Sequence, residues 1–316
     1  GIAASPLIEK DLVILHIGGE HACLVALDKV SGEEKWKALD DRASYSAPII
    51  IEQAGQRVLV CWTGDSVAGL AAATGKVRLS KLMSEQGICS RREADVYIER
   101  GWVLVDDVPV TELGTRIWPT QKITLTAAAK KQQQARVTIL IHKPIGFVSG
   151  QAEDNHRPAV TLVTTQTQYR SERDAPRFDP RHLRGLAPAG RLDIDSTGLL
   201  VLTQDGRIAK QLIGGNSRVE KEYLVRVEGP LDSHDLALLN HGLALDGKQL
   251  RPAQVRWANE DQLCFVLKEG RKRQIRRMCE LVGLRVTGLK RVRIGRVRLG
   301  DLPLGQWRYL RENERF

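Results

Sequence analysis

Residues 190–198 read GRLDIDSTG, and the apolar run LLVL follows directly at residues 199–202. Glycines at both ends of the stretch favour a sharp turn, and the apolar run predicts a buried strand. Asp193 therefore lies where a loop enters a buried strand, a place where a reactive carboxylate is held rigidly. Asp195 is the alternative acid, because it could equally cap the turn through the backbone groups that follow it.

A second stretch supplies positive charges for such an acid. Residues 269–278 read EGRKRQIRRM, and the pattern predicts a helix over residues 272–282. The buried side of this helix is formed by apolar residues at helical spacing, namely Ile275, Met278, Cys279 and Val282. Arg273 and Arg276 flank that side, so they can reach a neighbouring site and keep an acid there ionised.

The chain has 316 residues and a formal net charge of +10 at pH 7. This length predicts two or three domains. The charge is uneven, because residues 1–77 contain seven basic and ten acidic residues, a net of −3, whereas the rest of the chain carries +13. A basic surface that belongs to residues 78–316 favours nucleic acid as the partner. Together with a rigidly held carboxylate, it indicates an enzyme that acts on RNA.

The five cysteines are scattered and form no C-x-x-C pair. No histidine lies at ligand spacing from another candidate ligand, so we expect neither a zinc site nor a disulfide framework. We expect the cysteines to be buried structural thiols, which fits a reducing compartment, the cytoplasm. No apolar run approaches the roughly 18 residues of a membrane-spanning helix.

Residues 1–77 contain an internal repeat. VALDKVSG at residues 25–32 returns 43 residues later as AGLAAATG at residues 68–75. A period of this length with several short strands per unit is typical of propeller blades. The pattern A-L-D-x-x-[ST]-G-x-x-x-W at residues 26–36 resembles the quinoprotein-type (PQQ-like) propeller repeat. Fewer than two blades are present and closure takes about four, so we expect an all-β blade fragment with unpaired strand edges and no quinone cofactor.

The sequence of residues 78–126 indicates two short helices followed by strands. Ser90 and Glu93 have the spacing of a capping box, and Gly87 and Gly101 end the two helices. The text RLSK at the start of this piece and GICSRREAD at residues 87–95 look like an S4 RNA-binding domain, a small α/β fold. The resemblance implies that the basic first turns of both helices face RNA. The residues concerned are Arg78, Lys81, Arg91 and Arg92.

The hairpin that follows these helices departs from the S4 pattern. The family has V-x-V-[ND]-G, whereas this chain reads VLVDD at residues 103–107. Asp107 therefore stands where the family has glycine. Because glycine adopts a positive φ without strain, its loss disfavours a turn of that kind at the hairpin tip.

Residues 127–136 are a polar linker, and residues 137–316 mix strands and helices without regular alternation. Strands are predicted over 137–141, 199–203, 223–227, 263–267 and 286–294, and helices over 207–213, 233–240 and 272–282. The irregular order favours an α+β fold with a mainly antiparallel sheet. Residues 166–185 carry charges and prolines without periodicity and are expected to form a long loop.

Three motifs of this last piece match, in order, those of pseudouridine synthases. They are GRLD with TGLL within residues 190–200, KEYLV at 221–225, and EGRKRQIRRM at 269–278. KPIG at 143–146 and LPLGQW at 302–307 also agree. The S4-like piece and the Arg-Arg-Met ending indicate the RsuA-like branch, which modifies ribosomal RNA, with the large-subunit (RluF-like) members nearest. The resemblance covers about residues 78–316.

The resemblance implies roles for individual residues. Asp193 would be the nucleophile, attacking either the anomeric carbon of the sugar or the base, and Arg276 would pair with it. Tyr223 would lie against the target base and help to move a proton. Lys221 would contact the RNA backbone or brace the site. Other RNA contacts would come from Arg191, Arg271 and Arg273. Because the isomerisation involves no redox change, no cofactor and no metal are expected.

Two other functions stay open at this point. The chain could be a non-catalytic RNA-binding protein that kept the fold, or an interaction module led by residues 1–77 whose missing blades come from other chains. RNA binding weakens with added salt whether or not the protein is catalytic. Only a measurement of turnover therefore separates the enzyme from the non-catalytic RNA-binding protein. We expect residues 78–316 alone to be soluble and active as a monomer. The substrate would be ribosomal RNA, 23S in particular, free or in an assembly particle.

Overall fold

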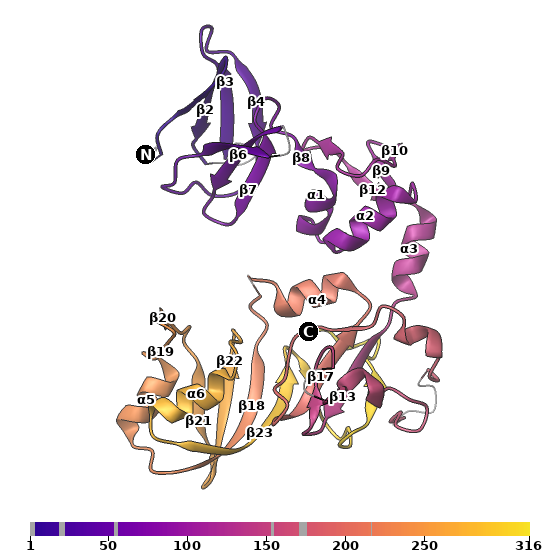
Figure 1. The fold of residues 1–316 in the computed structure, drawn as a ribbon, viewed down its shortest axis with the longest axis vertical. Helices are drawn as coiled ribbons and strands as arrows, with labels where there is room; N and C mark the ends of the chain where they lie inside the picture. Colours follow the sequence, from indigo (N-terminus) through magenta and orange to yellow (C-terminus); the bar gives the residue numbers. More distant parts are fainter. Residues whose placement is uncertain (1–3, 19–22, 54–55, 153–154, 171–175, 216) are drawn as a thin grey trace. The chain divides into compact units, whose positions relative to one another are not determined.

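The computed structural model of the chain describes residues 4–18, 23–53, 56–152, 155–170, 176–215 and 217–316 (Figure 1). The chain divides into two compact units, Gly1–Gln132 and Gln133–Phe316.

The first unit begins with two small antiparallel sheets. The first sheet runs in the order β1 (Leu7–Glu9), β2 (Leu12–His16), β3 (Leu24–Asp28) and β4 (Glu34–Ala38), and the second contains β5 (Ile49–Gln53), β6 (Gln56–Trp62) and β7 (Val67–Ala71). Each repeat of the sequence therefore folds as its own meander of strands. The described residues close no propeller, and the likeness to a PQQ-like propeller gains no support from the fold beyond these two sheets.

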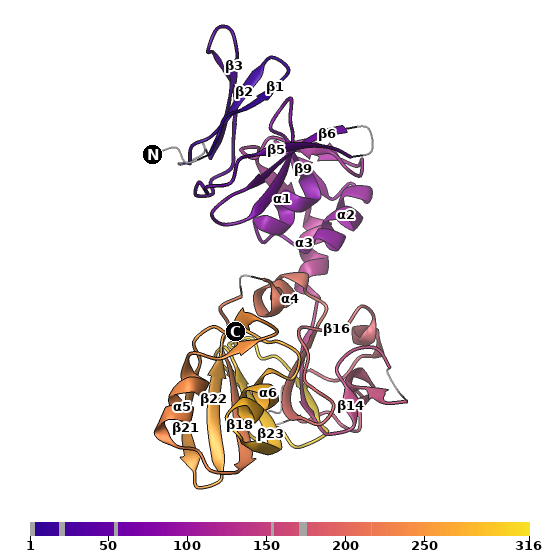
Figure 2. The same cartoon turned by 60° about the vertical axis from the view of Figure 1, so that its left-hand side comes forward.

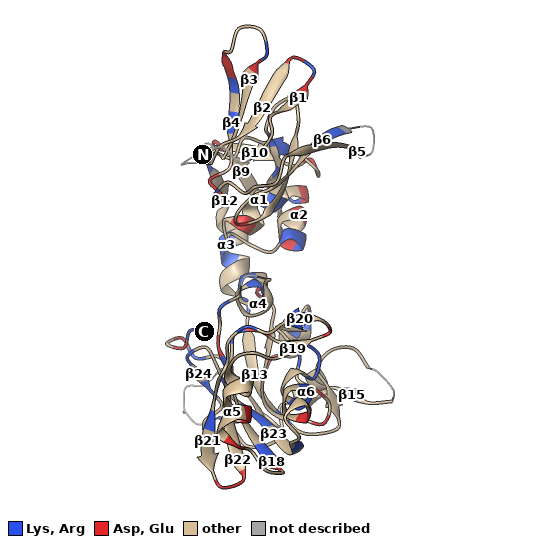
Figure 3. Ribbon diagram, turned by 90° about the vertical axis from the view of Figure 1, so that its left-hand side faces the viewer, with Lys and Arg blue, Asp and Glu red and all other residues tan. Residues whose placement is uncertain are grey.

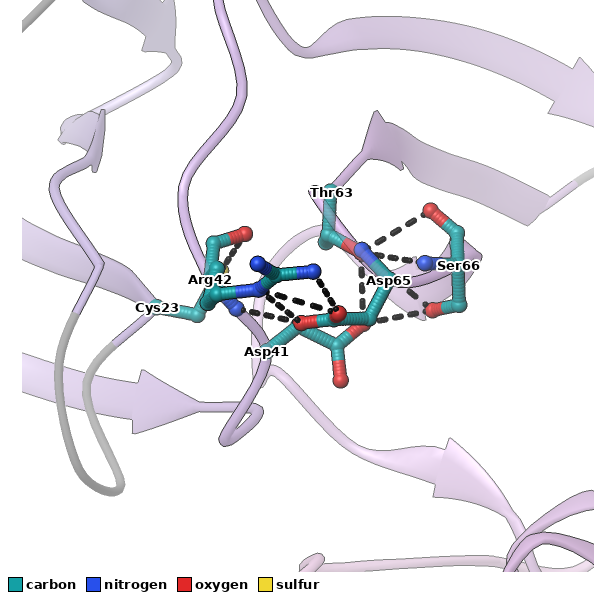
Figure 4. A network of polar contacts seen from close by, with 6 residues as sticks. All are labelled: Cys23, Asp41, Arg42, Thr63, Asp65 and Ser66. Carbon is teal, nitrogen blue, oxygen red and sulfur yellow. Dashed lines mark hydrogen bonds and ion pairs between the residues drawn. The ribbon is translucent and has the colours of Figure 1, made fainter.

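The two sheets are joined by an apolar and a polar contact. The buried ring of Trp36, from β4, lies against Gly75, where a Cβ atom would approach the ring to 2.8 Å. Figure 4 shows a set of hydrogen bonds and ion pairs that joins the β4–β5 connection to the β6–β7 turn and to Cys23, which precedes β3. Its members are Cys23, Asp41, Arg42, Thr63, Asp65 and Ser66.

The rest of the first unit matches the helices expected from sequence. Helix α1 (Leu79–Glu85) is followed by Gly87 at a φ of 73°, and α2 (Arg91–Glu99) begins with the predicted capping box of Ser90 and Glu93. Strand β8 (Val77–Arg78) pairs with β11 (Arg116–Ile117), and β9 (Val103–Val105) lies between β10 (Val108–Val110) and β12 (Ile123–Leu125). One continuous apolar core contains buried residues of the sheets and of both helices. The predicted boundary between residues 77 and 78 falls inside strand β8 and therefore divides one compact unit.

The hairpin tip between β9 and β10 corrects a prediction. Asp106 and Asp107 both adopt positive φ values, 48° and 65°, although neither is glycine. The turn is kept because the Asp106 carboxylate accepts hydrogen bonds from Gln121 Nε2 at 2.6 Å and from Lys122 N at 2.9 Å. Short acidic side chains tolerate this backbone region when they bond locally, so the missing glycine does not open the hairpin.

Helix α3 (Ala127–Gln134) occupies most of the predicted linker and leads into the second unit. The second unit is built on a nine-stranded sheet, with the order β21-β22-β18-β23-β17-β13-β25 and with β16 and β24 at its side. These strands are β13 (Thr138–Lys143), β16 (Ala187–Pro188), β17 (Thr197–Thr203), β18 (Lys221–Glu228), β21 (Gln254–Asn259), β22 (Gln262–Leu267), β23 (Arg285–Ile294), β24 (Val297–Arg298) and β25 (Trp307–Tyr309). All neighbours pair antiparallel except β17 with β23, which confirms the expected mainly antiparallel α+β fold.

Three helices cover the two faces of this sheet (Figure 2). Helices α5 (Ser233–Asn240) and α6 (Gln274–Leu281) share a core with one set of alternate residues of β13 and β17, whereas α4 (Gly206–Ile213) shares a second core with the other set. The five predicted strands and three predicted helices of this unit are confirmed within a few residues of their ends.

Short elements complete the second unit. They are β14 (Phe147–Val148) with β15 (Arg157–Pro158), β19 (Ala244–Leu245) with β20 (Lys248–Gln249), and the 3-10 helices η1 (Ala159–Leu162) and η2 (Pro180–Leu183). The predicted loop 166–185 contains η2 and is tied to β25 by the bond from Tyr169 N to Trp307 O. Residues 171–175 of that loop lie outside the described residues.

Candidate active site

A cavity of about 660 Å³ opens in the second unit at the meeting point of the three sequence motifs. Its wall is formed by the turn before β17, by β18, by β23 and by the segment that leads into α6. Figure 3 shows basic residues on β23 and beside α6 in this unit. All predicted site residues of this unit line the cavity. They are Arg191, Asp193, Lys221, Tyr223, Arg271, Arg273 and Arg276.

The backbone on both sides of Asp193 is held by the loop after β13. The buried hydroxyl of Ser149 accepts a hydrogen bond from Leu192 N and donates one to Leu192 O, both at 2.8 Å. Gly146 N donates to Ile194 O at 2.9 Å. The KPIG motif and Ser149 therefore fix the residue before and the residue after Asp193, and this explains how the turn holds its direction.

The carboxylate of Asp193 is half-buried and faces the cavity. Among the described residues, no hydrogen bond or ion pair engages its side chain. Its backbone carbonyl accepts a hydrogen bond from Ser196 N at 3.1 Å, which closes the turn. An acid in this position is free to react with a group that enters the cavity.

The predicted ion pair between Asp193 and Arg276 is not formed. Arg276 Nε lies 3.2 Å from Oδ2 of Asp195, and Nη2 of the same guanidinium donates to the backbone oxygen of Asp195 at 2.9 Å. Arg273 Nη2 also lies 3.0 Å from Asp195 Oδ2. The turn directs its second acid towards the start of α6 and its first acid into the cavity, so the arginines meet Asp195.

This pairing decides the charge state of Asp195. Its burial raises the pKa, but the hydrogen bond from Arg273 and the charges of Arg276 and Arg273 outweigh burial, so the pKa of Asp195 is lowered. The carboxylate is therefore ionised at neutral pH. The alternative in which the Asp195 side chain caps its own turn is not what the structure shows, because this side chain binds the two arginines.

Tyr223 lies on β18 with 9 % of its surface exposed, and it belongs to the apolar core as well as to the cavity wall. Arg291, on β23, places its guanidinium 5.9 Å from the centre of the Tyr223 ring. The Nε of Arg291 donates to Leu199 O at 2.7 Å, and Nη1 donates to Arg191 O at 3.1 Å. Sequence reasoning missed this buried cation, whose signal was an arginine at an inward position of the strand predicted over residues 286–294.

Two predicted RNA contacts are turned towards the protein. Lys221 Nζ donates to the carbonyls of Leu212, in the last turn of α4, and of Val219, each at 3.3 Å, and burial lowers the pKa of Lys221. This arrangement favours the bracing role that sequence left open for Lys221. The Arg271 guanidinium donates to the carbonyls of Leu245, Lys248 and Gln249 and so holds the β19–β20 hairpin.

Lys143 is a second buried cation that sequence reasoning left without a role. It ends β13, is fully buried, and donates to the carbonyls of Pro144 at 2.8 Å and of Phe147 at 2.9 Å. Burial is the largest effect on its charge and lowers the pKa of Lys143 to about 8. Burial destabilises the protonated form of Lys143, but its hydrogen bonds to the two carbonyls stabilise the turn of the KPIG motif.

The predicted RNA-binding residues of the first unit lie at the starts of α1 and α2. Arg78, Arg91 and Arg92 are exposed, and Lys81 is half-buried and lies 3.5 Å from Glu85. Positive side chains at a helix start add to the partial positive charge of the unpaired backbone N–H groups there. Such a surface attracts phosphate groups.

Other kinds of site find no support in the part of the chain that the structure describes. No group of three or more His, Cys, Asp or Glu side chains could hold a metal ion there. The five cysteines are free and buried, as predicted. Within the same residues, no helix has both the length and the apolar character needed to cross a membrane.

Comparison with known proteins identifies relatives of both units. The family described as RNA pseudouridylate synthase matches residues 137–281, and the S4 domain family matches residues 77–121. The chain is 35 % identical over 240 residues to the dual-specificity RNA pseudouridine synthase RluF of Escherichia coli K12, covering 75 % of this chain and 77 % of that protein. It is 31 % identical to the ribosomal large subunit pseudouridine synthase B of Bacillus subtilis, covering 75 % and 93 %.

A solved structure agrees with these relatives. The crystal structure of a pseudouridylate synthase superimposes with a TM-score of 0.51 and 26 % identity, covering 74 % of this chain and 96 % of that one. The match therefore extends to the fold.

Proposed function

The chain belongs to the RNA pseudouridylate synthases and is an isomerase of that type, and from this we propose that it converts a uridine of ribosomal RNA to pseudouridine, with Asp193 as the nucleophile. The observation that carries the proposal is the position of the Asp193 carboxylate, which is rigidly held, unpaired and faces a cavity lined with arginines.

The chemistry requires one nucleophile and several holding groups. The bond between N1 of the base and C1′ of the ribose breaks, the base turns, and C5 bonds to the same carbon. The proton on C5 leaves and N1 gains one, so neither a redox partner nor a net proton is consumed. Asp193 attacks either C1′ or the base and is released again when the new bond is complete.

The cavity wall suits a uridine that has left its stack. Flipping a base out of folded RNA costs a few kcal/mol, and stacking on an aromatic ring returns about 1–3 kcal/mol. Tyr223 offers that ring, and its phenol can help to move the proton from C5. Arg276 supplies positive charge at the wall, and Arg191, Arg273 and the exposed cations of α1 and α2 contact RNA phosphates.

The substrate and the setting are inferred from the relatives. The Bacillus relative is named for the large ribosomal subunit, and this favours 23S ribosomal RNA, free or in an assembly particle. We propose that the protein acts as a monomer in the cytoplasm, where such RNA is found. Five buried thiols without disulfides suit that compartment.

For residues 1–77 we propose a smaller role. The sequence repeat, with one meander of strands for each copy, is the ground on which we propose a pair of blade-like units of the PQQ-like kind. They are too few to enclose a cofactor. We propose that they are dispensable for pseudouridine formation.

The test replaces the nucleophile without changing its shape. Asp193→Asn should bind a 23S transcript labelled with tritium at uridine C5 as the unchanged protein does, but release tritium at least about a thousandfold more slowly. Asp246→Asn is the matched control, because it removes an exposed carboxylate that pairs with Arg277 on α6. Tritium release by Asp193→Asn close to the unchanged rate would refute the assignment and leave RNA binding as the function.

A further inference from the structure

Strand β23 contains an extra residue at the point where it passes Tyr223. It pairs antiparallel with β18, and the register between the two strands shifts by one residue between Glu222 and Tyr223. Glu222 lies opposite Arg293. The next residue of β18, Tyr223, lies opposite Arg291, which leaves Val292 without an opposite residue. One residue more on one strand than on its neighbour is a β-bulge, and this bulge lies directly beside the cavity wall.

Two charged contacts lie on opposite faces of these strands and depend on the bulge. Consecutive residues of a strand point to opposite faces, so Glu222 points to the face away from Tyr223, the outer face. In a regular strand, residues 291 and 293 would share one face. The Arg291 guanidinium nevertheless lies 5.9 Å from the centre of the Tyr223 ring. Arg293 Nε donates to Glu222 Oε2 at 2.6 Å on the outer face. Val292, the extra residue, allows the two arginines to face opposite sides.

The contact on the outer face is fixed by further bonds. Arg293 Nη1 donates to Gly295 O at 2.7 Å, and Arg293 Nη2 lies 3.4 Å from Oε2 of Glu220. The second oxygen of Glu222 accepts a weak hydrogen bond from the Cys264 thiol, on β22, at 3.7 Å. The side chains of Arg293 and Glu222 are only 20 % and 26 % exposed. Salt screens such a partly buried pair less than it screens a pair on the open surface.

On the other face, Arg291 holds both ends of the turn that carries Asp193. Its Nε donates to Leu199 O at 2.7 Å, and its Nη1 donates to Arg191 O at 3.1 Å. If the bulge were lost, Arg291 would turn to the outer face and both bonds would break. The turn of Asp193 would then lose a restraint on each side. A misplacement of about 1 Å is enough to slow a reaction about a hundredfold.

We propose that Glu222 is a positioning residue that fixes the bulge through its ion pair with Arg293. The bulge keeps Arg291 on the cavity side of the sheet, where it holds the turn of Asp193. Neither Glu222 nor Arg293 lines the cavity, so the pair acts without touching the uridine. This inference rests on the proposed role of Asp193 as the nucleophile.

A double-mutant cycle tests whether Glu222 acts through Arg291. The four proteins are the unchanged chain, Glu222→Gln, Arg291→Gln and the double variant, each with the full 316 residues. Each is assayed by tritium release from a 23S transcript labelled at uridine C5. We expect Glu222→Gln to lower kcat about tenfold with KM within about threefold. In the Arg291→Gln background, the same change should alter kcat by no more than about twofold.

Arg293→Gln removes the same ion pair from its other side. It should lower kcat by the same factor as Glu222→Gln, and this comparison stands even if Arg291→Gln is too unstable to assay. Glu228→Gln is the matched control. Glu228 also pairs across β18 and β23, with Arg285, but both side chains are exposed and Glu228 lies outside the cavity. Its loss should leave kcat unchanged.

Amide hydrogen exchange reports on the bulge itself. Leu299 N donates to Val292 O at 2.8 Å, so its exchange shows whether the extra residue keeps its place. In Glu222→Gln we expect the Leu299 amide to exchange at least about tenfold faster. The Ala189 amide, which donates to Val201 O elsewhere in the sheet, should not change. A general loss of stability would instead lower the thermal midpoint and speed exchange at both amides. Unchanged exchange at Leu299 would overturn the proposal.

Asp193→Asn is assayed in parallel so that the two assignments can fail separately. If Asp193→Asn is inactive while Glu222→Gln matches the unchanged protein, the positioning role is wrong and the nucleophile stands. If Asp193→Asn remains active, the nucleophile is wrong and the positioning role falls with it. Independent effects of Glu222→Gln and Arg291→Gln in the cycle would also overturn the proposal. The conservative variant Glu222→Asp should recover part of kcat, because it keeps the charge on a shorter side chain.

Discussion

The hydroxyl of Ser149 satisfies both backbone groups of Leu192, the residue before the proposed nucleophile. A buried N–H and a buried C=O cannot turn to water when a partner is lost, so one small side chain stabilises the turn twice. Nothing about a serine six residues after β13 marks it as special. Its role follows from a contact across 43 residues of sequence.

Ser149→Ala should leave both backbone groups of Leu192 unpaired. We expect a loss of about 1–3 kcal/mol in the free energy of unfolding for each unpaired group and a fall in kcat of about tenfold or more, because the turn loses its direction. Urea unfolding and tritium release measure the two effects. Thr161→Ala, which removes an exposed bond to Pro158 O outside the cavity, should change neither. Unchanged kcat in Ser149→Ala would contradict the bracing role.

The buried cation Lys143 makes a prediction about pH. Burial lowers the pKa of Lys143 to about 8, helped by Arg291 and opposed by Asp195 and Asp193. In the unfolded chain the lysine pKa is about 10.4. Between these two pH values the unfolded state binds more protons than the folded state. The contribution of Lys143 to the free energy of unfolding therefore rises as the pH rises.

The rise should reach at most about 3 kcal/mol, and Lys143→Met should lack it. Urea unfolding at about pH 7 and about pH 10 gives the change in the free energy of unfolding for each protein. Subtracting the two changes cancels the contributions of the other groups that titrate in this range. Equal changes in stability in the two proteins would show that Lys143 keeps its proton in the folded state.

At the scale of elements, the parallel pair of β17 and β23 brings the turn and the cations together. Thr197 and Gly198 pair with Lys290 and Arg291, so the proposed nucleophile's turn is joined to the strand that carries the buried arginine. Gly198 has a φ of 113°, and a Cβ atom there would lie 2.2 Å from Arg291 O. The motif needs glycine at this place because two backbones meet.

Gly198→Ala should therefore be strongly destabilised. The added methyl group meets backbone rather than a flexible side chain, so we expect a loss of at least about 3 kcal/mol or failure to fold. Gly150→Ala, where a Cβ atom would meet nothing within 4 Å, is the control and should be close to neutral. Thermal or urea unfolding measures the stability of both variants. A Gly198→Ala protein as stable as the unchanged chain would show that β17 and β23 can move apart without loss of stability.

At the scale of the whole molecule, the question is how much of the chain the reaction needs. The cavity is built from residues of Gln133–Phe316 alone, and the S4 match begins at residue 77, within β8. The core of the first unit, however, contains buried residues from the sheets of residues 1–77 and from the helices after them. Removal of the sheets therefore exposes apolar surface without touching the cavity.

A chain of residues 77–316 should form pseudouridine at a rate within about threefold of the full chain, with a lower thermal midpoint. It retains β8, which pairs with β11 and carries the buried Val77. A chain that begins at residue 80 lacks this strand and should bind RNA more weakly. Tritium release, RNA titration and thermal unfolding of the two chains are the measurements. An insoluble or inactive chain of residues 77–316 would show that residues 1–76 are required for folding.

Local patterns were enough to predict much of this protein. The capping box at Ser90, the stop at Gly87 and the apolar spacing of α6 each depend on neighbours within a few residues, so sequence predicted them and the structure agrees. The three motifs found in the sequence likewise contain residues that line one cavity. Side-chain hydrogen bonds to residues distant in sequence decided what local propensity could not, as at Asp106, where contacts to Gln121 and Lys122 keep a turn that glycine usually forms.

The partners of the charged groups were decided only by the tertiary structure. Sequence placed Asp193 and Asp195 two residues apart and supplied Arg276 from far along the chain, but it could not say which carboxylate the guanidinium would meet. That choice depends on the direction of a turn fixed by Ser149 and on the register of β17 against β23. Ion pairs act over a few ångströms, and sequence patterns record local periodicity, so only the folded chain determines such distances.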